Sequence, residues 1–477
     1  MLGPATNFLE VDAMSTSRVS RRQFLHTAAA ASAACAAPLV VPASALGLAD
    51  APPPSQRIHV GMIGVGRQAR AYNVKQFLGM PDVQVLAVCD VDAWRLANAK
   101  QQVEEAYGKQ APSGAYKGCD TYVDFREVLN RKDIDAVMIS TPDHWHVPMA
   151  LAAFEAGKDV SLEKPITRTI GEGRRLSDAA RKRQRIFRVD SELRSYAHIV
   201  QAAEIVRNGL IGKVHTVTVG VPGSDVGCAA QPDMPVPPEL DYERWQGPAP
   251  RAAYTEFRVH GPKAYGRPGW MRHLYYCDGM ITNWTTHWND GAMFATGLER
   301  TGPVEIEGSG EYPPAESFWN VLVKFEVKMR FADGVRWTYR TEKPFFRIEG
   351  SEGWVYAEYT QLQAKLGDQE GYLFFNDRKA KTRPQLMPAP QFKAGAVRFE
   401  VKTDKQDFID SVKTRRETLQ PAEVGHRVTS LGHLGHIAIQ LGQKLLWDPQ
   451  QERFAGNEAA NAMIDKPIHQ PRHAVVG

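Results

Sequence analysis

The chain has 477 residues, of which 43% are hydrophobic and 23% are charged, and its formal net charge is +4. This length predicts two domains, because single hydrophobic cores stop growing at about 250–300 residues. The small, dispersed charge argues against a nucleic-acid-binding surface, and the balanced composition argues against a chain that is disordered as a whole.

The first 45 residues have the pattern of an export signal. A twin-arginine sequence at 20–25 precedes an apolar, alanine-rich run at 28–41, and the small residues of 43–45 are typical of a cleavage site. The apolar run is shorter than the ~20 residues that a membrane-spanning helix needs, so we expect no membrane span. We predict a signal peptide at 1–45, a proline-rich linker at 46–56, and a periplasmic or otherwise exported protein.

Strand-like and helix-like segments alternate in the next part of the chain. The strand-like segments are Ile58–Ile63, Val83–Cys89, Ala136–Ile139 and 159–162, and amphipathic stretches separate them. This alternation predicts a doubly wound parallel sheet. We therefore place an α/β Rossmann domain at 57–185.

A dinucleotide-binding fingerprint follows the first predicted strand. Gly64, Gly66 and Ala69 fit the spacing G-x-G-x-x-A, which allows a tight turn, close approach of a pyrophosphate, and close packing of helix on strand. Asp90 lies 26 positions after Gly64, at the end of the next predicted strand, where a carboxylate can bind the adenosine ribose. The pattern predicts NAD rather than NADP, although the basic side chain of Arg67 is compatible with a 2′-phosphate.

Two polar segments follow further predicted strands, at the edge where ligands bind in parallel sheets. The first is Thr141–His146 and the second is Glu163-Lys164-Pro165. A lysine beside the positive nicotinamide ring would serve as an acid or base near neutral pH. No cysteine or carboxylate has a spacing that would complete a zinc site with the two histidines of the first segment, so we expect no metal.

The second half of the chain has a different pattern. Alternating segments such as Val214–Val221 and Trp319–Phe331 predict an α+β domain with a large, mostly antiparallel, open-faced sheet at 186–448, followed by a C-terminal tail at 449–477. The proline-rich stretch Gln231–Pro250 predicts a long surface loop or arm.

These motifs together resemble the Gfo/Idh/MocA family of oxidoreductases, and specifically its exported branch. The resemblance covers Arg57 to Arg472 and rests on the glycine loop, on Ser140–His146, on Glu163–Thr167 and on Thr286–Asp290. The family implies a nicotinamide cofactor, and a homodimer or homotetramer formed through the open-faced sheet.

The resemblance also implies roles for individual residues. Lys164, His287 and Asn283 are expected at the reacting hydroxyl, the lysine and histidine handling its proton. The expected cofactor-binding residues are Gly64, Gly66, Arg67, Gln68, Asp90, Thr141, Pro142, His146, Glu163 and Pro165. The expected substrate contacts are Trp284, Arg194, Tyr276 and Asp290.

Two features depart from the family pattern. Position 283 is asparagine where many relatives carry aspartate, and an amide cannot accept a proton as a carboxylate does. Asp278 or Asp290 is a candidate source of the missing carboxylate. The stretch Arg188–Arg194 is charged where relatives are rich in glycine and glutamine, which predicts either altered substrate contacts or a salt-bridged strand end.

The leading hypothesis is an exported NAD-dependent oxidoreductase that acts on a hydroxyl of a sugar, glycoside or cyclitol. Because an exported enzyme has no free NAD pool, we expect its cofactor to stay bound and to be recycled. One alternative is a redox-neutral glycosidase or epimerase-type enzyme that passes through a transient ketone. Another is a non-catalytic, NAD-retaining sugar-binding protein.

Overall fold

The computed structural model describes residues 52–53, 56–110 and 116–465. The predicted signal peptide, much of the linker and the last twelve residues of the C-terminal tail lie outside the described residues. The described residues from Arg57 onward belong to one compact unit, to which the following account refers.

The first part of this unit is a parallel six-stranded sheet, which confirms the predicted Rossmann fold. Its strand order is β3-β2-β1-β4-β5-β6. The strands are β1 (Ile58–Ile63), β2 (Val83–Cys89), β3 (Asp120–Tyr122), β4 (Ala136–Ile139), β5 (Asp159–Glu163) and β6 (Phe187–Asp190). The central strands β1 and β4 are almost entirely apolar because helices cover both faces of a parallel sheet. The sheet extends to Asp190 rather than ending at residue 185, since the buried strand β6 pairs with β5.

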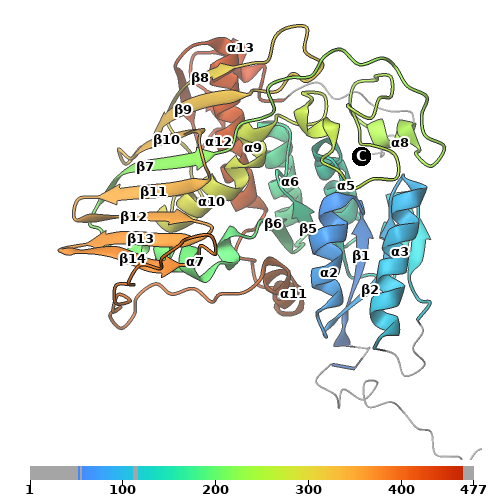
Figure 1. The fold of residues 1–477 in the computed structure, drawn as a ribbon, viewed down its shortest axis with the longest axis horizontal. Coiled ribbons are helices and arrows are strands. Elements are labelled where there is room, and N and C mark those ends of the chain that lie inside the picture. Colours follow the sequence, from blue (N-terminus) through green and yellow to red (C-terminus); the bar gives the residue numbers. More distant parts are fainter. Residues whose placement is uncertain (1–51, 54–55, 111–115, 466–477) are drawn as a thin grey trace, which may run out of the picture. The chain divides into compact units, whose positions relative to one another are not determined.

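Helices flank this sheet on both faces (Figure 1). They are α2 (Val74–Leu78), preceded by the π-helical turn η3 (Ala69–Asn73), α3 (Ala93–Gly108), α4 (Phe125–Asn130), α5 (Asp143–Glu155) and α6 (Ile170–Lys182). A helix from much later in the chain, α11 (Asp404–Thr414), also packs here. Its Phe408 and Ile409 join the apolar cluster of β1 and β2.

The second part contains a ten-stranded sheet in the order β14-β13-β12-β11-β7-β10-β9-β8-β15-β16. Its strands are β7 (Val214–Val221), β8 (Glu305–Glu311), β9 (Lys324–Arg330), β10 (Arg336–Thr341), β11 (Phe345–Gly350), β12 (Gly353–Glu358), β13 (Gln361–Leu366), β14 (Gln369–Phe375), β15 (Leu445–Asp448) and β16 (Arg453–Phe454). Neighbouring strands are antiparallel except β7 and β10, which are parallel. The sheet confirms the predicted α+β domain.

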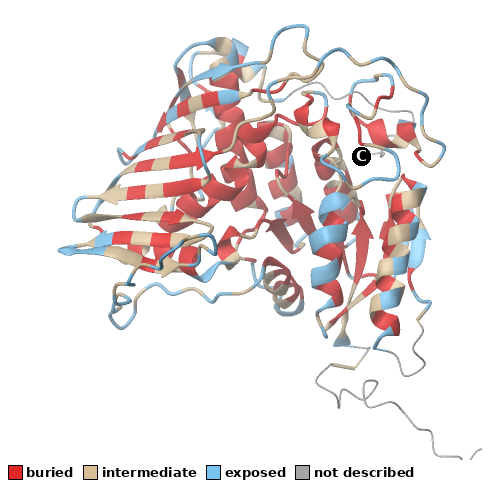
Figure 2. Ribbon diagram, in the orientation of Figure 1, coloured by how far each residue is buried: buried red, intermediate tan, exposed pale blue. Residues whose placement is uncertain are grey.

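One face of this sheet is covered by helices and buries alternate side chains (Figure 2). The helices of the second part are the 3₁₀ turn η4 (Leu193–Ser195), α7 (Ala197–Arg207), α8 (Tyr242–Gln246), the 3₁₀ turn η5 (Gly269–Arg272), α9 (Met280–Asn283), α10 (Thr285–Thr296), α12 (Ala422–Leu441) and α13 (Glu458–Asn461). The predicted C-terminal tail is not separate, because Phe454 and Ala460 belong to the same apolar core.

Candidate active site

The glycine loop follows β1 and has a shape that only glycine accommodates. Gly64 has a φ of +80°, and a Cβ there would lie 2.8 Å from the carbonyl of Ser140. At Gly66 a Cβ would lie 3.1 Å from a guanidinium nitrogen of Arg95. The bare backbone leaves room for a pyrophosphate, so the loop fits a dinucleotide.

Asp90 lies beside this loop at the end of β2. Its carboxylate accepts hydrogen bonds from the backbone amides of Val65 (2.8 Å) and Asp92 (3.0 Å). Burial raises the pKa of Asp90, while Arg95 and the two amides act in the opposite direction. The carboxylate is therefore fixed at the place where an adenosine ribose would bind.

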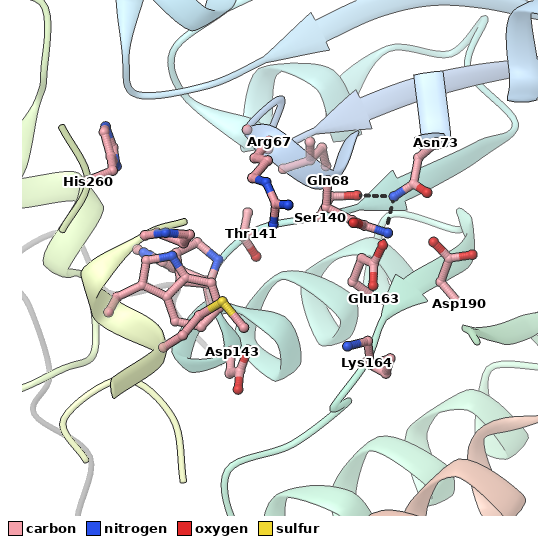
Figure 3. A pocket seen from close by; sticks show the side chains of 18 of the residues that line it. Arg67, Gln68, Asn73, Ser140, Thr141, Asp143, Glu163, Lys164, Asp190 and His260 are labelled. Atoms are coloured by element: carbon pink, nitrogen blue, oxygen red, sulfur yellow. Dashed lines mark hydrogen bonds between the residues drawn. The ribbon is translucent and has the colours of Figure 1, made fainter. Parts of the chain in front are cut away.

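A cavity of about 810 Å³ runs from the glycine loop to the junction of the two domains. Figure 3 shows Arg67 and Gln68 on one side and Glu163 and Lys164 on the other. The predicted site residues that line the cavity are Gly64, Gly66, Arg67, Gln68, Asp90, Thr141, Pro142, Glu163, Lys164, Asn283, Trp284 and His287.

Two predicted cofactor-binding residues, His146 and Pro165, lie behind the cavity wall. The ring nitrogens of His146 lie 2.8 Å from the carbonyl oxygen of Pro165 and 2.9 Å from that of Thr141. His146 thus lies between the loops that follow β4 and β5 and contacts both. Burial lowers its pKa, so a neutral ring that donates one of these bonds is favoured.

The side chain of Glu163 is held in place by Asn73. The Asn73 amide donates to Glu163 Oε1 (3.0 Å) and to the hydroxyl of Ser140 (2.9 Å), as Figure 3 shows. These contacts connect η3 with the ends of β4 and β5, next to Lys164.

Lys164 and Asn283 meet across the boundary between the domains. The Nζ of Lys164 donates a 2.9 Å hydrogen bond to Oδ1 of Asn283, which ends α9. The structure therefore brings together the lysine of the first domain and the residue that departs from the family pattern in the second.

His287, one helical turn further along, contacts the loop after β6. Its Nδ1 lies 3.1 Å from the hydroxyl of Ser191 and 3.4 Å from Oε2 of Glu192. Among the described residues, no group hydrogen-bonds its Nε2. Burial, reinforced by the charge of Lys164, holds the pKa of His287 well below its usual range, so the ring is neutral around neutral pH.

Glu192 supplies the carboxylate that position 283 lacks. Its side chain lines the cavity beside His287 and accepts a 3.4 Å hydrogen bond from the hydroxyl of Tyr359. Burial raises the pKa of Glu192, partly offset by Lys164. The sequence drew attention to the charged stretch that contains Glu192 but did not identify this residue.

Neither aspartate that the sequence suggested as the carboxylate source reaches the cavity. Asp278 lies 3.2 Å from Nδ1 of His433 and 3.4 Å from Nδ1 of His436, both on α12. Asp290 is fully buried and pairs with Arg194 at 2.6 Å. Both side chains are held within the protein interior.

Three of the four predicted substrate contacts therefore lie outside the cavity. Arg194 and Asp290 form a buried ion pair that stabilises α10 against η4. Tyr276 is completely buried in an aromatic cluster, 4.9 Å between ring centroids from Trp245. Only Trp284 lines the cavity, with its ring centroid 5.7 Å from that of His287.

The sequence also missed a buried carboxyl group and a long segment of the cavity wall. Asp143, at the start of α5, lines the cavity, and no hydrogen-bond partner of its Oδ2 lies among the described residues. Burial raises its pKa well above the usual range. Residues 231–239 of the predicted surface arm form an irregular loop without buried residues, whereas residues 240–249 pack inward and bury Trp245. The aromatic residues in that proline-rich stretch were the available signal.

No helix among the described residues is long and apolar enough to cross a membrane. Within the same residues, no group of three or more His, Cys, Asp or Glu side chains could hold a metal ion.

Comparison with family models agrees with this geometry. A model described as an oxidoreductase family with an NAD-binding Rossmann fold matches residues 58–191. A second model, described as the C-terminal alpha/beta domain of an oxidoreductase family, matches residues 196–374 and 387–474.

Individual proteins provide further comparisons. An alpha-N-acetylgalactosaminidase of Shewanella oneidensis is 32% identical over 209 residues, which cover 41% of this chain and 44% of that protein. The chain thus aligns with less than half of this curated relative.

Solved structures show the shared fold. A levoglucosan dehydrogenase in complex with NADH is 18% identical with a TM-score of 0.57, covering 82% of this chain and 98% of that one. An aldose-aldose oxidoreductase from Caulobacter crescentus complexed with glycerol is 18% identical with a TM-score of 0.56, covering 82% and 99%.

Proposed function

Because the chain belongs to the Gfo/Idh/MocA family of oxidoreductases with an NAD-binding Rossmann domain, we propose that it oxidises or reduces a hydroxyl-bearing carbon of a sugar, glycoside or cyclitol. The twin-arginine pattern at 20–25 supports export as part of this proposal. In that setting the dinucleotide stays bound and is recycled between turnovers.

The observation that carries the proposal is the position of Lys164. Its Nζ lies in the same cavity as the glycine loop, bonded to Asn283 and near His287. The cavity volume of about 810 Å³ is within the range of ligand sites in proteins. A cofactor on the glycine loop and a substrate at Lys164 would therefore share one enclosed space.

The chain's own residues fit a bound dinucleotide. Gly64 and Gly66 would leave the backbone open to the pyrophosphate, Asp90 would accept hydrogen bonds from the adenosine ribose, and Thr141 and Pro142 line the same cavity. A nicotinamide ring, when bound, supplies the hydride acceptor or donor.

The protein handles the proton of the reacting hydroxyl. Lys164 can hydrogen-bond the substrate oxygen, because Asn283 fixes its Nζ through only one of the three ammonium donors. The neutral His287 can accept a proton at Nε2, and Glu192 stabilises the resulting imidazolium through Nδ1. Asn283 thus orients the lysine. Glu192 takes the electrostatic role that an aspartate at position 283 would have.

Several features support a carbohydrate-like substrate. Trp284, Tyr359 and Trp270 line the cavity, and aromatic faces of this kind stack on sugar rings. The compared dehydrogenase and oxidoreductase are named for levoglucosan and aldoses.

A second candidate is the redox-neutral reaction, in which transient oxidation to a ketone acidifies the neighbouring C–H bond. The specific observation in its favour is Glu192, a cavity-lining carboxylate of raised pKa that can remove such a proton. The curated relative named alpha-N-acetylgalactosaminidase is consistent with it, since its name describes a hydrolase.

The test is turnover of purified protein on a panel of sugars and aryl glycosides, compared with the Lys164→Met variant. We expect the wild type to convert at least one substrate and the variant to lose about 10²-fold or more in rate. Incorporation of solvent deuterium into the product without net cofactor reduction would identify the redox-neutral reaction. Equal rates for both proteins would overturn the assignment to this site.

A further inference from the structure

A segment of the second domain lies across the dinucleotide end of the cavity. This segment, here called the strap, comprises residues 239–268, and it contains α8. Figure 1 shows α8 at the upper right, above α3 in this view. The strap residues that line the cavity are Glu243, Arg244, Trp245, Gly247, His260, Gly266, Arg267 and Pro268.

The strap is attached to the Rossmann domain first by its backbone. The amide of Ala93 donates to the carbonyl of Glu239 (2.8 Å), and the amide of Asp241 donates to the carbonyl of Val91 (2.9 Å). These bonds flank a short antiparallel bridge between Asp92 and Leu240. The first residues of the strap therefore pair with the segment just after β2, two residues from Asp90.

A second attachment centres on Asp92, which caps the first turn of α3. Its carboxylate accepts from the amides of Trp94 and Arg95, and it lies 3.1 Å from Nε2 of His260 on the strap. Burial lowers the pKa of His260, so the neutral ring donates this bond. Both side chains are buried, so removing either one would leave the other as a buried polar group without its hydrogen bond, which would lower stability.

A third attachment surrounds Tyr265. Its ring centroid lies 5.0 Å from that of Trp94, and the guanidinium of Arg70 lies 4.8 Å from the same ring. Arg95 donates a 3.0 Å hydrogen bond to the carbonyl of Ala264. The strap is thus held on α3 and on the turn that follows the glycine loop.

The strap is also fixed at the opposite side of the cavity. The indole of Trp145 donates to the carbonyls of Arg244 and Trp245 (both 3.1 Å), and Nε2 of His144 lies 3.0 Å from the latter. The strap therefore contacts both α3 and α5 while several of its residues line the cavity.

The strap brings a second arginine to the cavity. Arg267 lines it together with Arg67 of the glycine loop. Burial and the positive charges of Arg272 and Arg67 lower the pKa of Arg267, partly offset by Asp225. The ion pair of Arg267 with Asp225 is long, at 3.6 Å. Arg67 and Arg267 repel each other, and a pyrophosphate bound between them would offset this repulsion by accepting hydrogen bonds from both.

We propose that the strap is a device that retains the dinucleotide, with Arg267 completing the pyrophosphate site opposite Arg67 and His260 anchoring the strap to Asp92. The cofactor then lies between the glycine loop and the strap, and it leaves only when these attachments open. This rests on the proposed function in one respect, which is that the cofactor is resident.

The test measures cofactor release rather than turnover. Holoenzyme loaded with NADH is mixed with a large excess of NAD, and the loss of fluorescence of bound NADH gives the dissociation rate. The variants are Arg267→Ala, His260→Ala and, as a matched control, Arg251→Ala, which removes an exposed strap arginine that does not line the cavity.

We expect Arg267→Ala and His260→Ala to release NADH about tenfold faster than the wild type or more, a factor of ten corresponding to about 1.4 kcal/mol. Arg251→Ala should keep the wild-type rate. The proposal is overturned if Arg267→Ala matches the wild type, if Arg251→Ala accelerates release equally, or if the wild type empties within the mixing time. Because release is measured without any substrate, failure of the strap and failure of the proposed reaction give different results.

Discussion

Lys164 and Asn283 form a 2.9 Å hydrogen bond that joins the end of β5 in the first domain to the end of α9 in the second. The acceptor is a neutral amide, so it orients the ammonium group without neutralising it. The position at which the chain departs from its family thus helps to place the lysine that defines the site.

Changing this acceptor to a carboxylate should change the pH dependence of the reaction. In Asn283→Asp, a negative charge at the same distance would stabilise the protonated lysine that donates to the substrate oxygen, so the fall of activity at alkaline pH should move to higher pH. The measurement is the pH profile of kcat/KM. Asn283→Ala, which removes the acceptor, should lower the rate without that shift, whereas an unchanged profile in Asn283→Asp would contradict the assigned contact.

Glu192 should determine the acidic side of the same profile. Burial raises the pKa of Glu192, while burial and the charge of Lys164 keep His287 neutral. Activity should therefore fall at acidic pH as Glu192 becomes protonated, and this fall should lie above the usual carboxyl range. Glu192→Gln should lower kcat by about 10²-fold and abolish this acidic limb. As a control, Glu307→Gln on exposed β8 should leave the profile intact. An acidic limb that persists in Glu192→Gln would assign it to another group.

The Arg194–Asp290 pair should matter for stability rather than for substrate binding. Both side chains are buried, so Asp290→Asn leaves Arg194 with only its longer ion pair to Glu299 (3.5 Å) and should cost roughly 3 kcal/mol in the free energy of unfolding. Urea denaturation measures this cost. The exposed pair of Arg300 and Glu417 provides the comparison, since Glu417→Gln should cost no more than about 1 kcal/mol. A stable Asp290→Asn variant with a raised KM would restore the predicted substrate role.

Asp90 should set the preference for NAD over NADP. Its fixed carboxylate would repel a 2′-phosphate, so wild-type protein should bind NAD more tightly than NADP, and Asp90→Ala should narrow the difference. Titration of protein fluorescence with each reduced cofactor gives the two values of Kd. Equal affinities in the wild type would show that Arg67 compensates for the carboxylate.

Local sequence signals were sufficient for the first domain. The glycine loop, Asp90 and the segment around Lys164 each follow a buried strand, and parallel strands place their carboxyl ends at one edge. The order of elements therefore determined which of these residues would meet. In the second half, apolar and polar residues alternate along each strand because only one face of the sheet is buried, and this alternation predicted the sheet.

Contacts between distant segments could not be obtained in this way. Arg194, Glu192 and Asp290 are all charged residues near the domain boundary, and the sequence does not show which of them pairs internally. The structure joins Arg194 to Asp290 and leaves Glu192 facing the cavity. The strap was missed because its aromatic residues Tyr242, Trp245 and Tyr254 form a small apolar cluster of their own with Tyr276, without the spacing of a regular strand or helix.

The central claim is that a resident dinucleotide and Lys164 act on one substrate in the same cavity, and single-turnover reduction of bound NAD tests it most directly. Purified protein, with no cofactor added, is mixed with the sugars and glycosides that it converts, and the near-ultraviolet absorbance of reduced nicotinamide is followed. We predict reduction of up to one equivalent per chain, transient if the reaction is redox-neutral, and its loss in Lys164→Met with the cofactor still bound. Reduction that is equally fast in Lys164→Met, or conversion of substrate by protein that carries no dinucleotide, would contradict the claim.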